Sequence, residues 1–271
     1  MKYKVLIIGF GKMGKLYSKY LTELEVEWSY YDPFTDGGEE GLYSLNNYSH
    51  IMISTPPDNH YASYKEIISL GFKGRIYIDK PVSVSKEQST MLDNEQVFCG
   101  MTERYNPAVS VLKELLDVDS LTSVKFTRYS TVSENMRVPV LFDLGIHDLD
   151  LYLYLLNCSD LPDVYDVFEK SKTCYIMSKH MNTLSIFEWS HESQRRESKI
   201  IILQKDKVYE ADLIDQTILM YADKQVCQNL YVNKDQPIRV TLKNFLDGGK
   251  CTARLSHEFM LDIINKGETT L

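Results

Sequence analysis

The chain contains 271 residues, of which 44% are hydrophobic and 25% are charged, and its formal net charge is −8. This length and composition are typical of a globular protein with one large domain or two ordinary ones. The negative charge argues against a nucleic-acid partner and against an anionic membrane surface. We expect neither a signal peptide nor a membrane span, because the N-terminus leads directly into a strand-like run and no apolar run is long enough to cross a bilayer.

The cysteines favour a reducing compartment. There are five of them, spread widely along the chain, and none forms a Cys-x-x-Cys pair. This pattern suggests neither a disulfide framework nor a zinc site, and we expect no bound metal. A cytoplasmic location is the simplest expectation.

The segment up to Asp32 carries the most informative pattern in the chain. An apolar run of strand length over residues 2–8 leads directly into a Gly-x-Gly-x-x-Gly motif at Gly9–Gly14. A helical pattern continues to Leu24, and a second strand over 26–31 ends at Asp32. Strand, glycine motif, helix, strand and acid in this order form the dinucleotide-binding fingerprint. The alternative is a glycine-rich turn that binds no ligand.

Each residue of this fingerprint has a physical task. Gly9 permits a tight turn, Gly11 lets the pyrophosphate approach the backbone, and Gly14 allows the helix to lie close to the strand. The free N–H groups and the dipole of the helix start favour a phosphate there. The carboxylate of Asp32 can accept both ribose hydroxyls of NAD and would repel the additional phosphate of NADP. Although Lys12 could offset part of that repulsion, we expect NAD rather than NADP. The neighbouring residues that we also expect at the cofactor are Phe10, Lys12, Met13 and Pro33.

Short strands and helices alternate over the rest of the first half. The expected strands are 50–54, 75–78 and 96–100. Three helices are expected: one that ends near Leu70, one over 86–93 and one over 108–117. This alternation predicts an α/β fold with a parallel, doubly wound sheet, in which ligands bind beyond the carboxyl ends of the strands. The loops that should meet at this edge contain Gly9–Gly14, Asp32, Ser54–His60, Asp79–Pro81 and Met101–Asn106. The further residues that we expect at the cofactor are Ser54, Thr55, Pro56, Asn59, His60, Asp79, Lys80 and Pro81.

The pattern changes near residue 120. A long strand is expected over 122–132 and a helix over 141–156. Strand-like runs follow at 163–170, 174–178, 184–191, 198–204, 207–211, 217–221 and 225–232, before a last helix at 252–265. These runs predict an antiparallel sheet in a second domain of α+β type. We therefore expect a dinucleotide-binding domain over 1–118 and a substrate-binding and dimerisation domain over 119–271.

Polar residues interrupt the apolar helix expected at 141–156. At about 100° per residue, Asp143, His147 and Asp150 share one face, whereas Asp148 points the other way. A carboxylate one turn from an imidazole can hold its tautomer and stabilise its protonated form, as a general base requires. The alternative is a buried histidine that pairs with an aspartate for a purely structural reason.

Lys80 is a second candidate for chemistry. It follows the strand at 75–78 and precedes Pro81, so its ammonium could reach the nicotinamide edge of a bound cofactor. There it could donate a hydrogen bond to the reacting oxygen and stabilise developing alkoxide charge. The alternative is an ordinary solvated lysine.

Taken in order, these motifs resemble the successive motifs of the Gfo/Idh/MocA oxidoreductases, which include glucose–fructose oxidoreductase and inositol dehydrogenase. The matching segments, within residues 1–157, are Gly9–Gly14, Thr55–His60, Asp79–Pro81, Glu103–Ala108 and Asp143–Asp150. The resemblance implies a Rossmann domain joined to a C-terminal domain with a large, open, mostly antiparallel sheet, whose outer face commonly makes a dimer contact. It also implies that Lys80 and His147 flank the substrate carbon that gives up hydride to nicotinamide.

The segment 103–107 narrows this resemblance. It is similar to the branch that oxidises the 3-hydroxyl of UDP-N-acetyl-hexosamines or of their uronic acids. The implied activity is NAD-dependent oxidation of UDP-N-acetylglucosamine, or a close nucleotide sugar, by a homodimer or homotetramer. The keto-sugar would feed an aminotransferase that makes a diamino sugar for a surface glycan. The residues that this resemblance offers for substrate contact are Lys80, Arg104, Tyr105, Asn106, Arg128, Arg137 and His147.

Other readings of the same fold stay open. The substrate could be a free polyol, a simple sugar or a biliverdin-like tetrapyrrole, although a tetrapyrrole reductase would not need Asp143 and His147. A free sugar would leave Arg104 and Arg137 with little to bind. Some members of the family are non-catalytic regulators that bind a dinucleotide and a protein partner. The sequence also departs from the family pattern, because Asp79 stands where a glutamate is usual.

Overall fold

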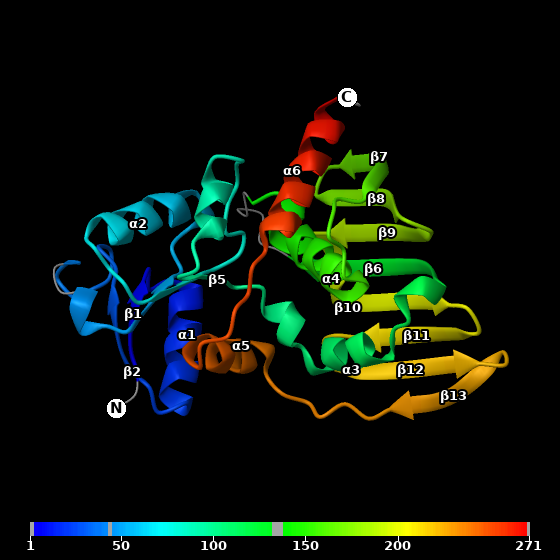
Figure 1. Cartoon of the computed structure of the whole chain (residues 1–271), viewed down its shortest axis with the longest axis horizontal. Helices are drawn as coiled ribbons and strands as arrows, with labels where there is room; N and C mark the ends of the chain where they lie inside the picture. Colours follow the sequence, from blue (N-terminus) through cyan, green and yellow to red (C-terminus); the bar gives the residue numbers. More distant parts are fainter. Residues whose placement is uncertain (1–2, 43–44, 132–137, 270–271) are drawn as a thin grey trace. The chain divides into compact units, whose positions relative to one another are not determined.

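The computed structural model describes residues 3–42, 45–131 and 138–269, and the chain divides into two compact units (Figure 1). Unit 1 comprises Met1–Thr102 and Gln236–His257, and unit 2 comprises Glu103–Asp235 and Glu258–Leu271. This division differs from the expected boundary between residues 118 and 119. It falls earlier in the chain, and a late segment returns to unit 1.

Unit 1 is built on a parallel sheet with the spatial order β2-β1-β3-β4-β5. Its strands are β1 (Lys4–Ile8), β2 (Glu27–Tyr31), β3 (His50–Ile53), β4 (Arg75–Ile78) and β5 (Val97–Cys99). The apolar residues of β1 and β3 are buried on both faces, as in sheets that helices cover on each side. The strand order reverses between β1 and β3, which is where doubly wound sheets bind ligands. The expected parallel α/β sheet is confirmed.

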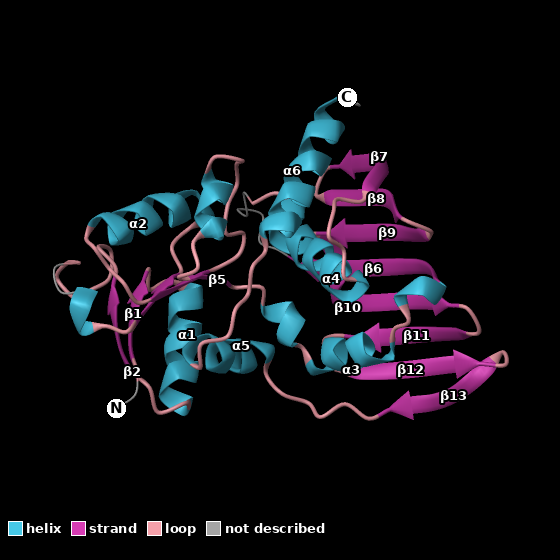
Figure 2. Ribbon diagram, viewed as in Figure 1, coloured by secondary structure: helices cyan, strands magenta, loops and turns pink. Residues whose placement is uncertain are grey.

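Among the described residues, three helices lie wholly within unit 1 (Figure 2). They are α1 (Lys12–Glu23), α2 (Pro57–Ser69) and α5 (Pro237–Leu246), together with the 3₁₀ segments η1 (Leu45–Asn47) and η2 (Gln88–Asp93). Helix α1 starts directly after the glycine loop. Helix α2 starts at a proline, which is well tolerated there because an N–H in the first turn would have no acceptor within the helix. The helix expected at 86–93 is a 3₁₀ segment instead.

Helix α5 was not expected from the sequence. Its Phe245 is fully buried, with its ring 5.5 Å from the ring of Tyr77 and 5.4 Å from that of Phe98. Arg75 of β4 donates a hydrogen bond to the carbonyl of Phe245 at 2.6 Å. These contacts with β4 and β5 are the reason why this late segment belongs to unit 1.

Unit 2 is built on a larger sheet with the order β13-β12-β11-β10-β6-β9-β8-β7. Its strands are β6 (Leu121–Thr131), β7 (Asp163–Lys170), β8 (Thr173–His180), β9 (Thr183–Ser190), β10 (Glu192–Gln204), β11 (Lys207–Asp212), β12 (Thr217–Ala222) and β13 (Gln225–Leu230). Strands β6 and β9 run parallel, and all the other neighbours run antiparallel. The expected large, mostly antiparallel sheet is confirmed.

Helices cover one face of this sheet (Figure 1). The helical segments are η3 (Thr102–Tyr105), α3 (Pro107–Leu115), η4 (Val118–Ser120), η5 (Leu141–Gly145), α4 (Ile146–Leu156) and α6 (Arg254–Thr269). Helix α4 is buried on nearly all sides, which explains its almost continuous apolar sequence. The core beneath it includes Phe126 and Phe187 of neighbouring strands, whose rings stack at 5.2 Å.

The opposite face of the unit 2 sheet carries both apolar and charged side chains. Lys125 of β6 forms an ion pair with Glu188 of β9 at 3.0 Å. Phe168, Met177 and Leu203 are exposed large apolar side chains of β7, β8 and β10. This face is therefore only partly polar.

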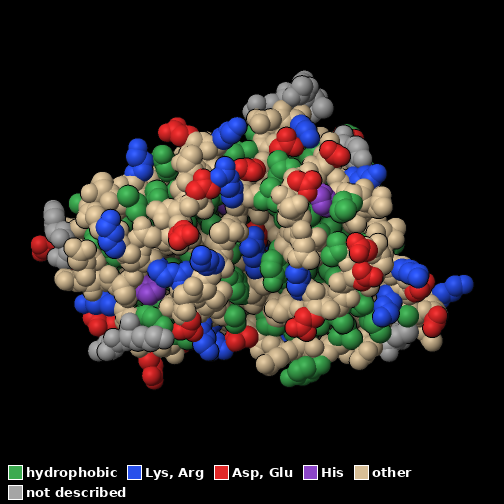
Figure 3. All heavy atoms as spheres, in the orientation of Figure 1, with side chains coloured by type: hydrophobic (Ala, Val, Ile, Leu, Met, Phe, Trp, Pro, Cys, Tyr) green, Lys and Arg blue, Asp and Glu red, His purple; other side chains and the backbone are tan. Residues whose placement is uncertain are grey.

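Charged groups of both signs are interspersed over the face of the protein shown in Figure 3. Within the described ranges, none of the helices combines the length and the apolar character needed to cross a bilayer.

Candidate active site

The glycine loop between β1 and α1 is shaped by close backbone contacts. Gly9 has a φ of +91°, and a Cβ there would lie 2.8 Å from the backbone nitrogen of Thr55. A Cβ on Gly14 would lie 2.2 Å from the carbonyl oxygen of Gly9, so glycine is required for α1 to approach β1. A Cβ on Gly11, in contrast, would meet no atom within 4 Å. Packing of the protein does not require Gly11, and its bare backbone leaves room for the pyrophosphate of a dinucleotide.

The carboxylate of Asp32 is held in a fixed position at the end of β2. Its Oδ2 accepts the backbone N–H of Phe10 at 2.6 Å, and its Oδ1 accepts that of Phe34 at 2.9 Å. Each carboxylate oxygen has a further lone pair with which it can accept a ribose hydroxyl. The first turn of α1 has no side-chain cap, so its N–H groups can bind a phosphate. The residues of this edge therefore fit a nicotinamide dinucleotide.

The loops after β3 and β4 are joined to each other through His60. Its Nε2 lies 2.8 Å from the carbonyl oxygen of Thr55, and its Nδ1 lies 2.9 Å from that of Pro81. The side chain is buried, and burial lowers the pKa of His60, an effect that the nearby Asp79 opposes. The hydroxyl of Ser54 donates to the carbonyl of Gly9 at 2.7 Å. The structure thus brings together three of the loops that the sequence predicted at this edge.

Asp79 fixes the backbone that leads to Lys80. Its Oδ1 accepts the backbone N–H of Lys80 at 2.8 Å. Burial raises the pKa of Asp79, and the neighbouring Lys80 and His60 oppose this rise. The aspartate that replaces the usual glutamate therefore makes a contact with the backbone, and Lys80 itself is half-buried.

In unit 2, Asp143 lies in the π-helical turn η5, and His147 lies in the first turn of α4, which continues from η5. Single π turns inside helices are frequent at functional sites. The turn depends on Gly145, because a Cβ there would lie 2.8 Å from Leu141 Cδ1 and 3.0 Å from Trp189 Cζ3. Glycine therefore lets this turn pack directly on the indole of β9.

The carboxylate of Asp143 contacts a residue that the sequence did not suggest. Its Oδ2 lies 3.1 Å from Nε2 of His191, which follows β9 and is 4% exposed. The interaction of Asp143 with His147, one turn away, remains a prediction. His147 itself is half-buried.

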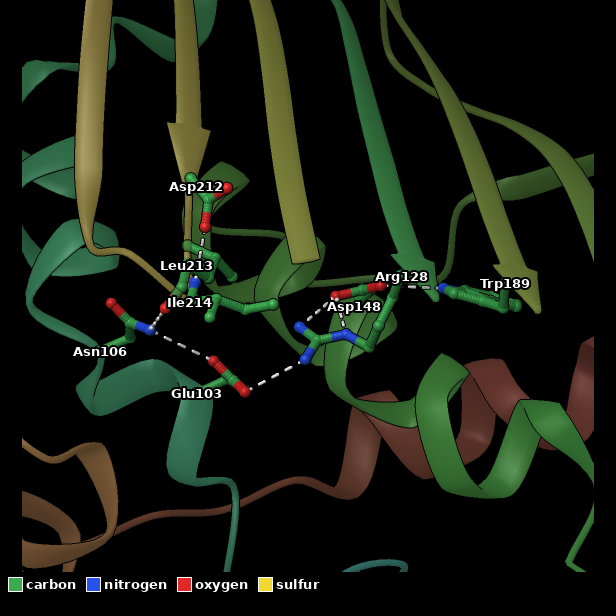
Figure 4. A network of polar contacts seen from close by, with 8 residues as sticks. All are labelled: Glu103, Asn106, Arg128, Asp148, Trp189, Asp212, Leu213 and Ile214. Atoms are coloured by element: carbon green, nitrogen blue, oxygen red, sulfur yellow. Dashed lines mark hydrogen bonds and ion pairs between the residues drawn. The ribbon is translucent and has the colours of Figure 1, made fainter. Parts of the chain in front are cut away.

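Asp148, the next residue, is held from two strands (Figure 4). Its Oδ1 accepts hydrogen bonds from Nε and Nη2 of Arg128 at 3.0 and 2.7 Å, and its Oδ2 accepts one from Trp189 Nε1 at 2.9 Å. The guanidinium also donates to Oε1 of Glu103 at 3.1 Å. Burial raises the pKa of the Asp148 carboxyl, and Arg128 opposes this rise. Burial alone would lower the pKa of Arg128, but Asp148 and Glu103 raise it above its ordinary value.

Asp150 does not act as an open neighbour of His147. Both of its carboxylate oxygens accept hydrogen bonds from Arg104, each at 2.6 Å, in a bidentate pair. The expected common face of Asp143, His147 and Asp150 therefore includes one carboxylate that is already bound by an arginine. Arg104 supplies the partner of Asp150, whereas Arg128 of β6, which also pairs with Glu103, supplies the partner of Asp148.

The residues predicted for substrate contact have varied environments. Asn106 is buried, caps α3 by accepting the N–H of Ala108 at 3.1 Å, and donates to the carbonyl of Leu213 at 2.9 Å. Arg104 and Arg128 are bound to the acids of α4. All three side chains thus have partners within unit 2, and their contact with a sugar or a diphosphate stays a prediction. Tyr105 is half-buried, and Arg137 lies outside the described residues.

Trp189 and His191 are the site residues that sequence reasoning missed. They stand two positions apart on and just after β9, so both point to the helix-covered face of the sheet. A tryptophan and a histidine on the core face of a strand carry polar atoms that need hydrogen-bond partners when they are buried. This need was the signal in the sequence that could have indicated their contacts with acids. In the described part of the chain, no three His, Cys, Asp or Glu side chains are grouped so that they could hold a metal ion.

In comparisons of sequence, no family model and no curated protein matches the chain. Solved structures match over nearly its whole length. The UDP-N-acetylglucosamine 3-dehydrogenase GnnA from Acidithiobacillus ferrooxidans is 16% identical, with a TM-score of 0.83 over 97% of this chain and 96% of its own. An oxidoreductase from Desulfitobacterium hafniense, described as NADPH-dependent, is 16% identical, with a TM-score of 0.85 over 99% and 96% of the two chains.

Levoglucosan dehydrogenase, in complex with NADH and levoglucosan, is 13% identical, with a TM-score of 0.81 over 98% of this chain and 97% of its own. At these identities the matches establish the fold. The fold that the resemblance to the Gfo/Idh/MocA oxidoreductases implies is therefore confirmed, and the chain has the fold of the dehydrogenases to which it is similar.

Proposed function

We propose that the protein is an NAD-dependent dehydrogenase that oxidises a secondary hydroxyl of a nucleotide sugar, such as the 3-hydroxyl of UDP-N-acetylglucosamine. The observation that carries the dehydrogenase proposal is the loop edge of unit 1, where the open backbone at Gly11 lies in the same fingerprint as the fixed carboxylate of Asp32. The nucleotide sugar is supported by the motif at 103–107 and by the structural similarity to a UDP-N-acetylglucosamine 3-dehydrogenase.

The residues of unit 1 would hold the cofactor. The N–H groups at the start of α1 bind the pyrophosphate, and Asp32 accepts the hydroxyls of the adenosine ribose, which favours NAD over NADP. Ser54 and His60 support the glycine loop and the loops after β3 and β4 through the carbonyl contacts described above. When bound, NAD supplies the acceptor for the hydride of the sugar carbon.

The chain's own residues would remove the proton of the sugar hydroxyl and stabilise the negative charge on its oxygen. His147 removes the hydroxyl proton, and Asp143 stabilises the imidazolium that results. Lys80 donates a hydrogen bond to the same oxygen and stabilises its developing negative charge. A general base of this kind contributes about 10²- to 10⁴-fold to the rate.

The test is NADH formation, followed by absorbance, with NAD and a panel of UDP-sugars and free sugars. A signal confined to UDP-N-acetyl-hexosamines supports both the reaction and the substrate class. The His147→Ala variant is expected to lose about 10²- to 10⁴-fold in kcat while it still binds NAD. Unchanged turnover in that variant would refute His147 as the base. Mass analysis of the sugar at stoichiometric enzyme detects a single turnover if NADH is released slowly.

A free sugar or polyol is the second candidate substrate, and one observation favours it. Arg104 and Arg128, two of the residues expected at a diphosphate, are engaged with Asp150 and Asp148 instead. Levoglucosan dehydrogenase, whose name specifies a sugar without a nucleotide, has the same fold. Turnover of free sugars with no preference for UDP-sugars would select this candidate.

A third candidate is a regulator that binds a dinucleotide without catalysis. It predicts NAD binding with no turnover of any sugar, even when the product of a single cycle is sought by mass. The presence of Lys80, Asp143 and His147 together favours an enzyme.

We also propose a cytoplasmic homo-oligomer whose keto-sugar product is consumed by an aminotransferase. The partly apolar outer face of the unit 2 sheet, with Phe168, Met177 and Leu203 exposed, supports association through this face. Light scattering on the purified protein, compared with a Leu203→Lys variant, tests this contact. A monomeric wild type would contradict it.

A further inference from the structure

We propose that His191 is a positioning residue for the catalytic pair, because it holds the carboxylate of Asp143 in the orientation in which that group supports His147. The inference deepens the proposed function and rests on it. Its basis is the contact between His191 Nε2 and Asp143 Oδ2 at 3.1 Å, made by an imidazole whose side chain is only 2% exposed. A hydrogen bond from an N–H to a carboxylate is stronger inside the protein than in water.

The sheet leaves the imidazole of His191 little freedom to move. The residue before it, Ser190, pairs with Thr173 of β8, and the residue after it, Glu192, pairs with Thr131 of β6. The backbone N–H of His191 donates to the carbonyl of Lys172 at 3.0 Å. The backbone at His191 is therefore fixed, and its buried imidazole can impose an orientation on the carboxylate that it contacts.

Strand β9 holds the helix of His147 at two points. Trp189 donates to Asp148, the residue after His147. His191 contacts Asp143, which lies four positions before His147. Trp189 and His191 are two positions apart, which places both side chains on the same face of the sheet. The tryptophan contact involves a fully buried acid, whereas the side chain of Asp143 is 23% exposed. Of these two acids, Asp143 is the one that is partly exposed, and we therefore assign to it the support of His147.

The expected consequence is a defect in catalysis rather than in binding. Without a donor at position 191, Asp143 can rotate away from His147, and misplacement of a catalytic group by about 1 Å can cost on the order of 100-fold in rate. The cofactor site lies in unit 1 and does not contain His191. NAD affinity should therefore be unaffected.

The experiment compares His191→Leu, which removes the donor, with His191→Gln, whose amide nitrogen can replace Nε2 as a donor. For His191→Leu we expect kcat to fall about 10- to 100-fold, with the KM of the sugar and the affinity for NAD unchanged. We expect His191→Gln to restore most of kcat. The matched control is His180→Gln, because His180 lies at the opposite end of the β8–β9 hairpin, where it pairs with Thr183.

A second readout does not depend on turnover. In protein with isotope-labelled histidine, nuclear magnetic resonance should show a hydrogen on Nε2 of His191, and Asp143→Asn should shift the ring signals of His191 but not those of His180. Unshifted His191 signals would overturn the inference.

The kinetic outcomes separate the inference from the proposed function. One possible result is that His147→Ala inactivates the enzyme whereas His191→Leu keeps the kcat of the wild type. This result would overturn the inference and leave the proposed function standing. A wild type that oxidises no sugar would overturn the proposed function and the role of His191 together.

Discussion

Replacement of Arg128 by methionine tests the buried network that fixes α4. The change leaves the Asp148 carboxylate, which is 2% exposed, with the indole N–H of Trp189 as its remaining donor in the network of Figure 4. Three hydrogen bonds of the guanidinium are lost, at 2.7, 3.0 and 3.1 Å. Removing one partner of a buried ion pair costs about 3–5 kcal/mol. At about 2–4 °C per kcal/mol, the melting temperature of the variant should fall by about 6–20 °C.

The assay is thermal unfolding followed by circular dichroism, and pH provides an internal check. Burial raises the pKa of the Asp148 carboxyl, and loss of Arg128 removes the charge that opposes this rise. An acid with a raised pKa in the folded state binds protons more readily when folded, so the stability of the variant should fall as the pH rises. The deficit of Arg128→Met should therefore be smaller at about pH 5 than at about pH 8.

Two further variants complete this test. Arg128→Met combined with Asp148→Leu should recover much of the loss, since it leaves no unpaired buried carboxylate at this position. Lys266→Met, which breaks an exposed pair with Asp262 at 3.0 Å, should cost less than about 1 kcal/mol. An Arg128→Met protein that melts at the wild-type temperature would refute the reasoning.

The remaining predictions concern unit 1. Gly11→Ala should leave the melting temperature unchanged and abolish NAD binding, measured by calorimetry, whereas Gly14→Ala should lower both, because its Cβ would lie 2.2 Å from a carbonyl oxygen; a Gly11→Ala protein that binds NAD normally would contradict the assigned pyrophosphate contact. Asp32→Ser should lower the ratio of kcat/KM for NAD over NADP about tenfold or more, at about 1.4 kcal/mol per tenfold, and an unchanged ratio would exclude Asp32 as the selector. Burial, followed by the charge of Arg75, lowers the pKa of His50 to about 4. Unfolded histidine has a pKa of about 6.5, so the contribution of His50 to the free energy of unfolding is complete above that pH. It falls by about 3 kcal/mol as the pH drops to about 4, because protonation then favours the unfolded chain. His50→Phe should lose this component in urea titrations, and an identical pH dependence in both proteins would argue against it.

Local patterns explain why the first unit could be predicted so fully. The glycine motif, the acid at Asp32 and the short apolar strands are each contained in a few consecutive residues, and a parallel sheet brings the following loops to one edge. Helix α5 could not be found in this way. Its burial depends on Phe98 and Tyr77, which are remote in sequence, and nothing local marks them as partners of Phe245.

The candidate site in unit 2 shows the same limit more sharply. The spacing of Asp143 and His147 is local and was visible in the sequence. The partners of the acids are distant, since Asp143 contacts a residue 48 positions away and Asp148 is bound by one 20 positions away. An arginine such as Arg128 therefore resembles a free phosphate ligand in the sequence, although a buried carboxylate already occupies it.

The measurement that tests the central claim most directly is the rate of NADH formation with UDP-N-acetylglucosamine in wild type and in His147→Ala. The account predicts turnover in the wild type and a loss of about 10²- to 10⁴-fold in the variant, with NAD still bound. Equal rates in the two proteins, or a wild type that binds NAD but oxidises neither nucleotide sugars nor free sugars, would contradict it.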